Sequence, residues 1–546
     1  MSRLREFAVD IKRAIETAWV MTKYGARPVA RRLLGYRSSA REEARSFRQA
    51  LEKLGLTYVK LGQFLALRYD FLPSDVCQEL NKLFDRVAPL AFAEVRRVIE
   101  NALGQKLDRL FLSFEETPIA SASVAQVHKA FTQDAQAVAV KVRRPGIEKT
   151  FAADIRNLRR AAAIADALGA FGSLSLKDVI TEFAAWTSRE LDFVQEGLTA
   201  DRLRQNALSY EVIPKVFWDL VTKEVLTMEF IEGPTLVKLI DLLEAGRPDL
   251  VYKQVPRLDI ELVGKRIAYA VLRQLFVSGF FHGDPHPGNL IIRNDNTVAF
   301  IDFGIYGELD ERQREILEGH IENIAIGNIR ESFRYYAMQY TPSPETNLIE
   351  FEREGIRILG NWYNASINPY ASTTERHLAT HGAEMLEVVR QNRLRLSMNT
   401  LLFWRALYTL DSVALQLSDY IDLMTQIKEF FYERRPGLLG RVVELLHVSK
   451  QNLAAMEFGR PLVTDTWTLM NDLSRGRQQW PVQTNGGRPS RRRRIRVGGT
   501  IALALAGASI AILTAIADRN GPLGLVAIAL TVLLLLSPLF MLKKHS

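Results

Sequence analysis

Hydrophobic residues recur at helical spacing near the start of the chain. Phe7, Ile11, Ile15 and Trp19 follow the period of an α-helix, so residues 4–35 are predicted to be helical. Basic residues lie between and after them. Such a helix fits either an anionic membrane surface or a position packed on the body of the protein.

A second helix is predicted to begin near residue 38 or 39 and to continue toward residues 58–64. Within it, residues 60–63 read Lys-Leu-Gly-Gln. A glycine such as Gly62 inside a helix costs about 1 kcal/mol relative to alanine. We therefore expect a reason for it, such as the close approach of another backbone. Taken alone, Lys60 equally fits a solvated lysine.

The hydrophobic period changes to that of strands after Leu110. Residues 118–130 read as a loop of small side chains entering a strand, and residues 137–142 predict a second strand after a polar turn. Lys141 in that strand is typical of the phosphate-gripping lysine of a kinase small lobe. An edge-strand lysine that discourages aggregation is the alternative. The loop residues expected over a nucleotide are Ala120, Ser121, Ala122 and Ser123.

Two helices are predicted next, one over residues 147–168 and one from Ser175, where the spacing resembles a capping box. The second is expected to continue through Glu190, Asp192 and Glu196. At about 100° per residue, Glu190 and Glu196 would point roughly 120° apart, so one helix could offer acids in two directions. A solvated acidic face is the alternative.

Residues 225–233 read as a strand that turns into a linker, as a hinge between two lobes would, with backbone groups near Glu229 free for the edge of an adenine. Farther on, the apolar segments 290–292 and 298–301 flank an Asn-Asp-Asn turn and predict a hairpin. Residues from about 312 to 437 are predicted to be mostly helical.

The strongest candidate chemistry lies on either side of that hairpin. Asp284 and Asn289 share a loop, and Asp302 opens an Asp-Phe-Gly triplet that the hairpin returns beside Asn289. In kinase-type phosphoryl transfer, one carboxylate orients the acceptor hydroxyl, while an Asn and a second Asp hold Mg²⁺ against the nucleotide phosphates. A polar surface loop is the alternative, but it does not explain why the hairpin returns the second Asp.

Composition narrows the class of protein. A length of 546 residues predicts two or three folding units, and 47% hydrophobic with 24% charged residues is ordinary for a globular protein. The net charge of +9 suggests an anionic partner such as a nucleotide or lipid headgroups. Cys77 is the single cysteine, which excludes an intramolecular disulfide and a multi-cysteine metal site and fits a reducing compartment.

Two uncharged segments, residues 497–517 and 521–542, lie near the end of the chain. Each is long enough to span a bilayer, and basic residues at 491–496 and 543–544 flank the pair. This pattern predicts a transmembrane hairpin with the rest of the protein on the cytoplasmic or equivalent side, and a buried core hairpin is the alternative. The arginine cluster favours anionic membrane lipids over nucleic acid, and no nucleic-acid partner is expected.

In combination, these motifs resemble the UbiB family of atypical protein-kinase-like proteins. The resemblance runs from about residue 40 to about residue 430, and the two C-terminal spans are similar to those of bacterial members. The string at 282–289 also resembles aminoglycoside and choline kinases, which lack the N-terminal extension. The matching strings are Lys60-Leu61-Gly62-Gln63, the Ala/Ser loop ending Gln126-Val127-His128, Val138-Ala139-Val140-Lys141-Val142 with Arg144-Pro145-Gly146, Glu190-Leu191-Asp192, residues 282–289 and Asp302-Phe303-Gly304.

The resemblance implies an α+β, bilobal protein-kinase-like fold with an N-terminal helical extension and a C-terminal transmembrane helical hairpin. The expected domains are the extension at 1–108, the small lobe at 109–232, the helical large lobe at 233–450, a basic linker at 451–496 and the spans at 497–517 and 521–542. An integral membrane protein, of a bacterial cytoplasmic membrane or an organelle equivalent, would follow.

For the site, the resemblance implies ATP and Mg²⁺ as cofactors. Lys141 would grip the nucleotide phosphates and pair with Glu196, but helix geometry leaves open whether Glu190 or Glu196 is the partner. The remaining implied roles are Lys60 held by Glu190 with Asp192 beside it, Asp284 as catalytic-loop acid, and Asn289 and Asp302 as Mg²⁺ ligands.

The function implied by the resemblance is a membrane-anchored, Mg-ATP-dependent kinase-like protein that supports ubiquinone or other prenylquinone biosynthesis. Its partners would be quinone-biosynthesis enzymes or prenylquinone precursors, with ATPase activity rather than routine protein phosphorylation. Two alternatives remain, a small-molecule kinase of the aminoglycoside or choline type and a non-catalytic scaffold that binds nucleotide and lipid.

Overall fold

The computed structural model describes residues 40–434 except 69–71, 84–87, 168–174, 343–345, 369 and 418–420, and it also describes residues 10, 12–17, 19, 20 and 23. The chain divides into two compact units, Met1–Tyr432 and Glu433–Ser546. The architecture below is that of the first unit, and the predicted domain boundaries inside it stay predictions.

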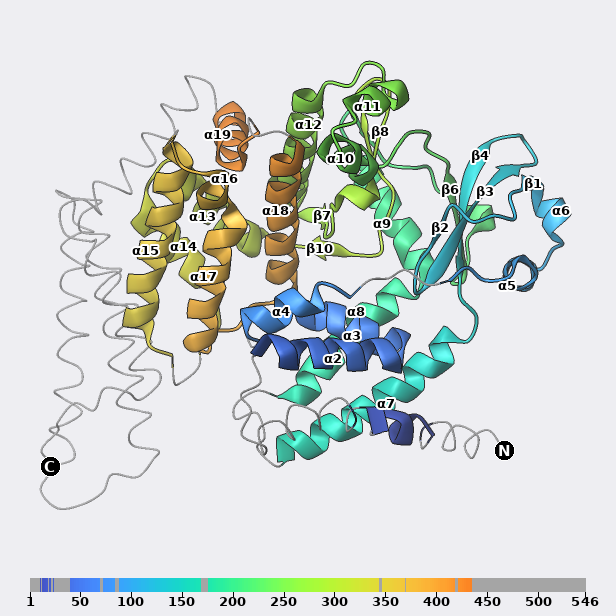
Figure 1. Ribbon diagram of the computed structural model, residues 1–546, viewed down its shortest axis with the longest axis horizontal. Helices are drawn as coiled ribbons and strands as arrows, with labels where there is room; N and C mark the ends of the chain where they lie inside the picture. Colours follow the sequence, from blue (N-terminus) through green and yellow to red (C-terminus); the bar gives the residue numbers. More distant parts are fainter. Residues whose placement is uncertain are drawn as a thin grey trace, which may run out of the picture. The chain divides into compact units, whose positions relative to one another are not determined.

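An antiparallel sheet with the strand order β1-β3-β4-β6, to which β2 adds by pairing with β3, forms the small lobe (Figure 1). Val138, Val140 and Val142 of β4 are buried against α5 (Phe92–Leu103), so the strand predicted over residues 137–142 is confirmed. The strands are β1 (Phe111–Phe114), β2 (Ala120–Ser121), β3 (Ala125–Thr132), β4 (Ala137–Arg143) and β6 (Val225–Glu229).

The large lobe carries short strands within a helical body (Figure 1). The predicted hairpin is confirmed, because β8 (Leu290–Ile292) pairs antiparallel with β9 (Val298–Phe300). Ile301 N then donates to the carbonyl oxygen of Asn289 at 3.1 Å, which brings Asp302 beside Asn289. Two further strand pairs are β7 (Phe280–His282) with β10 (Tyr306–Glu308), and β5 (Glu211–Val212) with β9.

The helices of the large lobe bury a continuous apolar core. Their bounds are α10 (Leu236–Glu244), α11 (Pro248–Gln254), α12 (Ile260–Arg273), α13 (Glu311–Ala325), α14 (Ile329–Met338), α15 (Leu348–Ile367), α16 (Thr373–Arg376), α17 (Leu378–Gln391), α18 (Met398–Leu417) and α19 (Leu423–Arg434). The predominantly helical C-terminal part predicted from about residue 312 is thus confirmed up to residue 434.

The helix predicted from residue 38 or 39 is two helices, α2 (Ala40–Leu54) and α3 (Leu56–Ala66). Gly55 separates them with a φ of 90°, a conformation that favours glycine. In α3, a Cβ on Gly62 would lie 2.2 Å from Cδ1 of Leu83 and 2.8 Å from Cδ1 of Leu51. The atoms nearest to Gly62 are thus leucine side chains, which a larger residue would displace, and not the backbone of another element.

The helix expected to carry both Glu190 and Glu196 is also two helices, α8 (Leu176–Glu190) and α9 (Phe193–Gln205). Asp192 between them has an extended backbone, and its side chain accepts a hydrogen bond from Val194 N at 3.1 Å, which caps α9. A capping side chain competes with the helix that precedes it, and this overturned the prediction of one continuous helix. The predicted cap at Ser175 is confirmed, because its hydroxyl accepts from Asp178 N.

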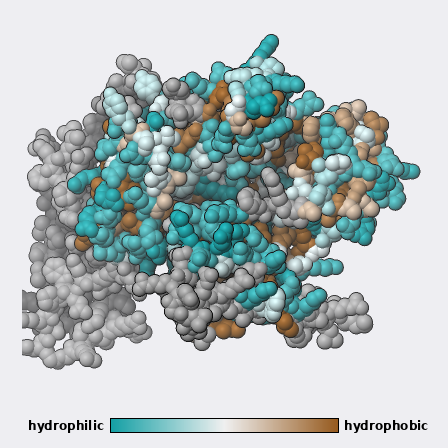
Figure 2. All heavy atoms as spheres, in the orientation of Figure 1, coloured by the Kyte–Doolittle hydropathy of each residue, from teal (hydrophilic) through white to brown (hydrophobic). Residues whose placement is uncertain are grey.

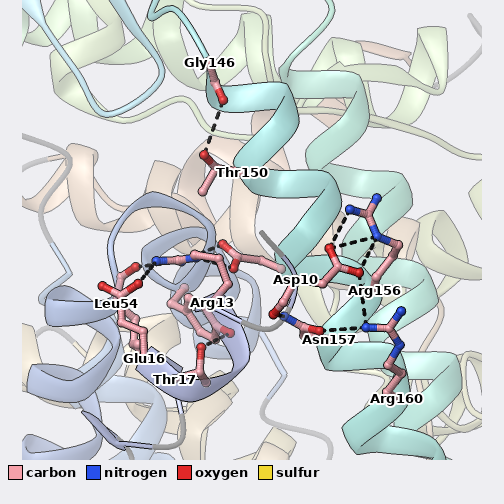
Figure 3. Close-up of polar contacts among 12 residues, drawn as sticks. Asp10, Arg13, Glu16, Thr17, Leu54, Gly146, Thr150, Arg156, Asn157 and Arg160 are labelled. Atoms are coloured by element: carbon pink, nitrogen blue, oxygen red, sulfur yellow. Dashed lines mark hydrogen bonds and ion pairs between the residues drawn. The ribbon is translucent and has the colours of Figure 1, made fainter. Parts of the chain in front are cut away.

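The described N-terminal residues are helical and contact α7 (Ile147–Ala167), as Figure 3 shows. Asp10 accepts hydrogen bonds from Arg156 at 2.7 Å and from Arg160 at 3.2 Å. Arg13 binds the buried carboxylate of Asp154 through two contacts of 2.8 Å. For the described residues of the segment predicted over 4–35, the structure shows the position packed on the body of the protein.

In the part of the chain that the structure describes, no helix combines the length and apolarity needed to cross a membrane. The 20-residue α18, for example, carries Arg405 and Asp411, and most of the visible described surface is hydrophilic (Figure 2). This finding contradicts the transmembrane hairpin in the expected fold and the integral-membrane localisation drawn from it. That expectation rested on length, on lack of charge and on the flanking basic residues, and the segments 497–517 and 521–542 lie outside the described residues.

A pH dependence of stability follows from the start of α17. Nδ1 of His377 lies 2.5 Å from Oδ2 of the buried Asp411, and this hydrogen bond raises the pKa of His377 above its ordinary value near 6.5. The stabilising contribution is therefore complete below pH 6.5 and is lost as the pH rises through the raised folded-state pKa. In urea unfolding between about pH 5 and 9, the wild type should lose stability on the alkaline side more steeply than His377→Gln. Parallel profiles would contradict this pairing.

Candidate active site

A cavity of about 990 Å³ is lined by residues of the N-terminal extension, the sheet and the helical lobe. This volume lies at the upper end of the range of small-molecule sites, about 300–1,000 Å³. The polar residues predicted for the site gather there, and they include Lys60, Lys141, Glu190, Asp284, Asn289 and Asp302. Apolar side chains form other parts of the wall, among them Val124, Ala139, Met228, Ile231, Ile291 and Ile301.

Lys141 on β4 connects the two lobes at the cavity. Its Nζ donates to Oε1 of Glu196 at 2.6 Å and lies 3.5 Å from Oδ1 of Asp302. Burial alone would lower the pKa of Lys141, but the carboxylates of Asp302 and Glu196 outweigh burial and raise it. Burial raises the pKa of Glu196, while the short contact with the ammonium favours its carboxylate form.

Asp302 follows β9 and accepts a hydrogen bond from Gly304 N at 3.1 Å. Burial raises the pKa of Asp302, but the Lys141 ammonium and the hydrogen bond from Gly304 N together lower it more, and the net pKa lies below its ordinary range. Because 47% of the side chain is exposed in the open cavity, solvent screens part of this effect. Asp302 is an anion at neutral pH.

Lys60 on α3 has a different acidic partner. It is 4% exposed and donates to Oε1 of Glu190, the last residue of α8. The sequence left open whether Glu190 or Glu196 pairs with Lys141. In the structure, Lys141 pairs with Glu196 and Lys60 pairs with Glu190. The structure does not bring Asp192 to the cavity wall, because that carboxylate caps α9 and lies 3.8 Å from Lys223.

His282 fixes the loop that carries Asp284. Its Nδ1 accepts from Asp284 N at 3.1 Å, and its Nε2 hydrogen-bonds the backbone oxygen of Asp302. Burial lowers the pKa of His282, so the neutral ring joins the two loops. Asn289 donates its amide nitrogen to the Asp284 carbonyl at 3.1 Å, which leaves its side-chain oxygen as the available metal ligand.

The sequence reasoning did not single out Arg405, which lies on α18 far along the chain from the motifs. Its Nη2 is 2.8 Å from Oδ2 of Asp284, and the two side chains are 25% and 22% exposed. No kinase-like spacing points to this residue. The amphipathic pattern of α18 does not predict the contact of Arg405 with Asp284, because that contact depends on how the helix packs against the loop of Asp284.

One set of contacts holds the Ala/Ser loop, and another holds the strand that follows it. Arg144 donates to the carbonyl oxygen of Ala122 at 2.9 Å and to the hydroxyl of Ser121 at 2.8 Å. The buried side chains of Gln126 and His128 hydrogen-bond each other at 2.9 Å. Gln126 also accepts from Leu90 N at 2.7 Å, and His128 contacts the carbonyl oxygen of Glu115 at 2.8 Å. The Arg144 contacts thus hold the loop itself, whereas those of Gln126 and His128 join β3 to residues outside the loop.

The other predicted nucleotide contacts divide between the cavity wall and its surroundings. Ala120 and Ala122 line the cavity, and so does Glu229 at the hinge. Ser121 is held by Arg144. The Ser123 hydroxyl is buried and has no hydrogen-bond partner among the described residues, and Ser123 does not line the cavity.

The donor set fits Mg²⁺ bound together with phosphate oxygens. Within the described ranges, no group of three or more His, Cys, Asp or Glu side chains is arranged to hold a metal ion. Asp302 and Asn289 both line the cavity and would offer Mg²⁺ two oxygen ligands, and Mg²⁺ is commonly held by one or two protein oxygens plus substrate phosphates. The two predicted ligands therefore fit a metal that arrives with a nucleotide.

Comparison with known proteins identifies a family domain in the chain. The ABC1 atypical kinase-like domain matches residues 82–335. The chain is 35% identical to the chloroplastic Protein ACTIVITY OF BC1 COMPLEX KINASE 7 of Arabidopsis thaliana over 52% of this chain and 39% of that protein. It is 31% identical to ACTIVITY OF BC1 COMPLEX KINASE 3, chloroplastic, of the same plant over 74% of this chain and 56% of that protein. The chain thus spans about half the length of these curated relatives.

One solved structure, the complex of Rv3197 with erythromycin from Mycobacterium tuberculosis, is similar with a TM-score of 0.48 and 23% identity, over 71% of this chain and 94% of that one. A TM-score below 0.5 at this identity does not establish a shared fold or function. The domain match over 82–335 includes Lys141, Glu196, Asp284, Asn289 and Asp302. Over residues 82–335, the chain belongs to the ABC1/UbiB-like family of atypical kinases.

Proposed function

We propose that this protein is a Mg-ATP-dependent ATPase or atypical kinase. The observation that carries the proposal is the convergence of Lys141, Asp284, Asn289 and Asp302 on one cavity with an apolar wall. A phosphate-binding cation, two oxygen ligands for a metal and a further carboxylate are the groups that phosphoryl transfer requires. Phosphorylation of a protein substrate is not needed for this proposal.

Each residue has a separate role in the proposed reaction. Lys141, held by Glu196, would bind phosphate oxygens, and Asn289 with Asp302 would hold Mg²⁺, which neutralises charge on the phosphates. Asp284 would orient the attacking oxygen. The neutral ring of His282 keeps the loop of Asp284 at a fixed position relative to Asp302.

The N-terminal extension suggests which acceptors can enter. Lys60 and Gln63 of α3 line the same cavity as Asp284, and α3 also contacts α8 (Figure 1). A helix in that position would restrict a protein substrate, so water or a small acceptor is favoured. We propose that the turnover supports prenylquinone biosynthesis, with enzymes or precursors of that pathway and anionic lipids as partners, as the family resemblance implies.

Lys60→Ala tests whether the extension belongs to the nucleotide site. The change leaves Glu190 without its ammonium partner inside the cavity, and the unpaired carboxylate should repel phosphates. We expect Mg-ATP affinity of the full chain to fall on the order of tenfold, measured by calorimetry, and Lys60→Ala/Glu190→Gln to recover most of it.

Lys106→Ala is the matched control, because Lys106 is 77% exposed and pairs with Glu100 away from the cavity. Its affinity for Mg-ATP should equal that of the wild type. If Lys60→Ala also binds like the wild type, Lys60 does not act on the nucleotide. A wild type that binds no Mg-ATP would refute the proposed function itself.

A further inference from the structure

Arg405 is positioned to bind a second anion besides Asp284. It is the one arginine among the described residues that line the cavity, where Lys60 and Lys141 are the other cations. Lys60 is paired with Glu190 and Lys141 with Glu196. Arg405 is paired with the carboxylate that the proposed function assigns to the attacking oxygen.

The helix that carries Arg405 is rigidly held. Next to it, Trp404 is 6% exposed and donates its indole Nε1 to Oε1 of Gln339 at 3.0 Å. One turn later, Tyr408 stacks on the Trp404 ring with 5.7 Å between the centroids. Both aromatic residues line the cavity beside Arg405. A guanidinium on such a helix is pre-organised, because only its own side chain has to be ordered when a ligand binds.

Charge favours an exchange of partners at Arg405. A terminal phosphate carries more negative charge than a carboxylate and accepts two parallel hydrogen bonds from a guanidinium. Arg405 lies on the large lobe and Lys141 on the small lobe, so the two cations face the cavity from different lobes. A triphosphate between them would meet positive charge from both lobes.

We infer that Arg405 binds the terminal phosphate of a nucleoside triphosphate, an inference that rests on the proposed function. When it does so, Arg405 breaks its ion pair with Asp284. The exchange frees the Asp284 carboxylate for the attacking oxygen at the moment when the phosphate arrives. Arg405 thereby acts in cis on the charge of the group to be transferred, as arginines do in other phosphoryl-transfer sites. It also gives the site a means to distinguish ATP from ADP.

The test compares two ligands of the full chain, a Mg-bound non-hydrolysable ATP analogue and Mg-ADP. Arg405→Gln should weaken binding of the triphosphate about tenfold, since a hydrogen bond to a charged group is lost, and leave Mg-ADP affinity nearly unchanged. Arg405→Lys should recover only part of the loss, because lysine cannot bind bidentately. Arg390→Gln on α17, which breaks a surface pair with Glu387, should change neither affinity.

A second variant separates direct contact from positioning of Asp284. In an Asp284→Asn background, Arg405→Gln should still weaken the triphosphate selectively if the guanidinium touches the phosphate. Equal weakening of both nucleotides, or loss of the selective effect in that background, would overturn the inference and leave Arg405 as a positioning residue. A wild type without nucleotide binding would instead refute the proposed function on which the inference rests.

Discussion

Asp302→Asn should reduce ATP turnover of the full chain by a hundredfold or more, on the order found when a preorganised electrostatic contact to the reacting group is lost. The substitution preserves shape but removes the charge that the Mg²⁺ site requires. It also removes the anion 3.5 Å from Lys141, so the ammonium keeps only Glu196 as partner. The rate is measured as phosphate release at saturating ATP and Mg²⁺.

The matched control for that change is Asp249→Asn on α11. Asp249 is 64% exposed and pairs with Arg247 at the surface, so the same chemical change should leave turnover at the wild-type rate. If both variants unfold at the same temperature as the wild type, a folding defect is excluded. If Asp302→Asn also turns over ATP at the wild-type rate, Asp302 is not a metal ligand in the reaction.

Arg13→Met should destabilise the protein by about 3–5 kcal/mol, which is the cost of leaving a buried charge without its partner. Asp154 on α7 has a side-chain exposure of 0%, and both of its oxygens accept hydrogen bonds from Arg13. The same guanidinium donates to the carbonyl oxygen of Leu54 at the end of α2 (Figure 3). One side chain thus joins the N-terminal residues to two helices, and urea unfolding followed by tryptophan fluorescence measures the loss.

A double variant identifies the origin of that loss. Arg13→Met/Asp154→Leu replaces the whole pair by apolar side chains and should be much more stable than Arg13→Met alone, because no buried charge is left. Arg353→Met is the surface control, since Arg353 is 69% exposed, and it should change stability by less than about 0.5 kcal/mol. If the double variant is no more stable than Arg13→Met, lost packing rather than an unpaired charge explains the effect.

The local parts of the site could be predicted from the sequence because neighbouring residues determine them. The hairpin of β8 and β9 follows from two short apolar segments around a polar turn, and it places Asp302 beside Asn289. The strand of Lys141 follows from alternating valines that pack on one side of the sheet. In both cases the hydrophobic pattern and the motif spacing indicate the same structure.

Features that depend on side-chain competition or on distant contacts could not be predicted. A helical period continues through residues 190–196, but the Asp192 carboxylate caps α9 and breaks the helix. The partners of Lys60 and Lys141 follow from that break, which puts Glu190 and Glu196 on separate helices. Arg405 meets Asp284 only because α18 packs beside the loop that carries Asp284, and no local pattern encodes that contact.

The central claim is that the cavity of Lys141, Asn289 and Asp302 binds Mg-ATP, and titration calorimetry of the full chain tests it most directly. We predict saturable binding of one ATP per chain that requires Mg²⁺ and is weakened strongly in Lys141→Ala, because the cation held by Glu196 is lost. Absence of ATP binding by the wild type would contradict the claim. So would binding by Lys141→Ala, or by the wild type in EDTA, that is as strong as binding by the wild type with Mg²⁺.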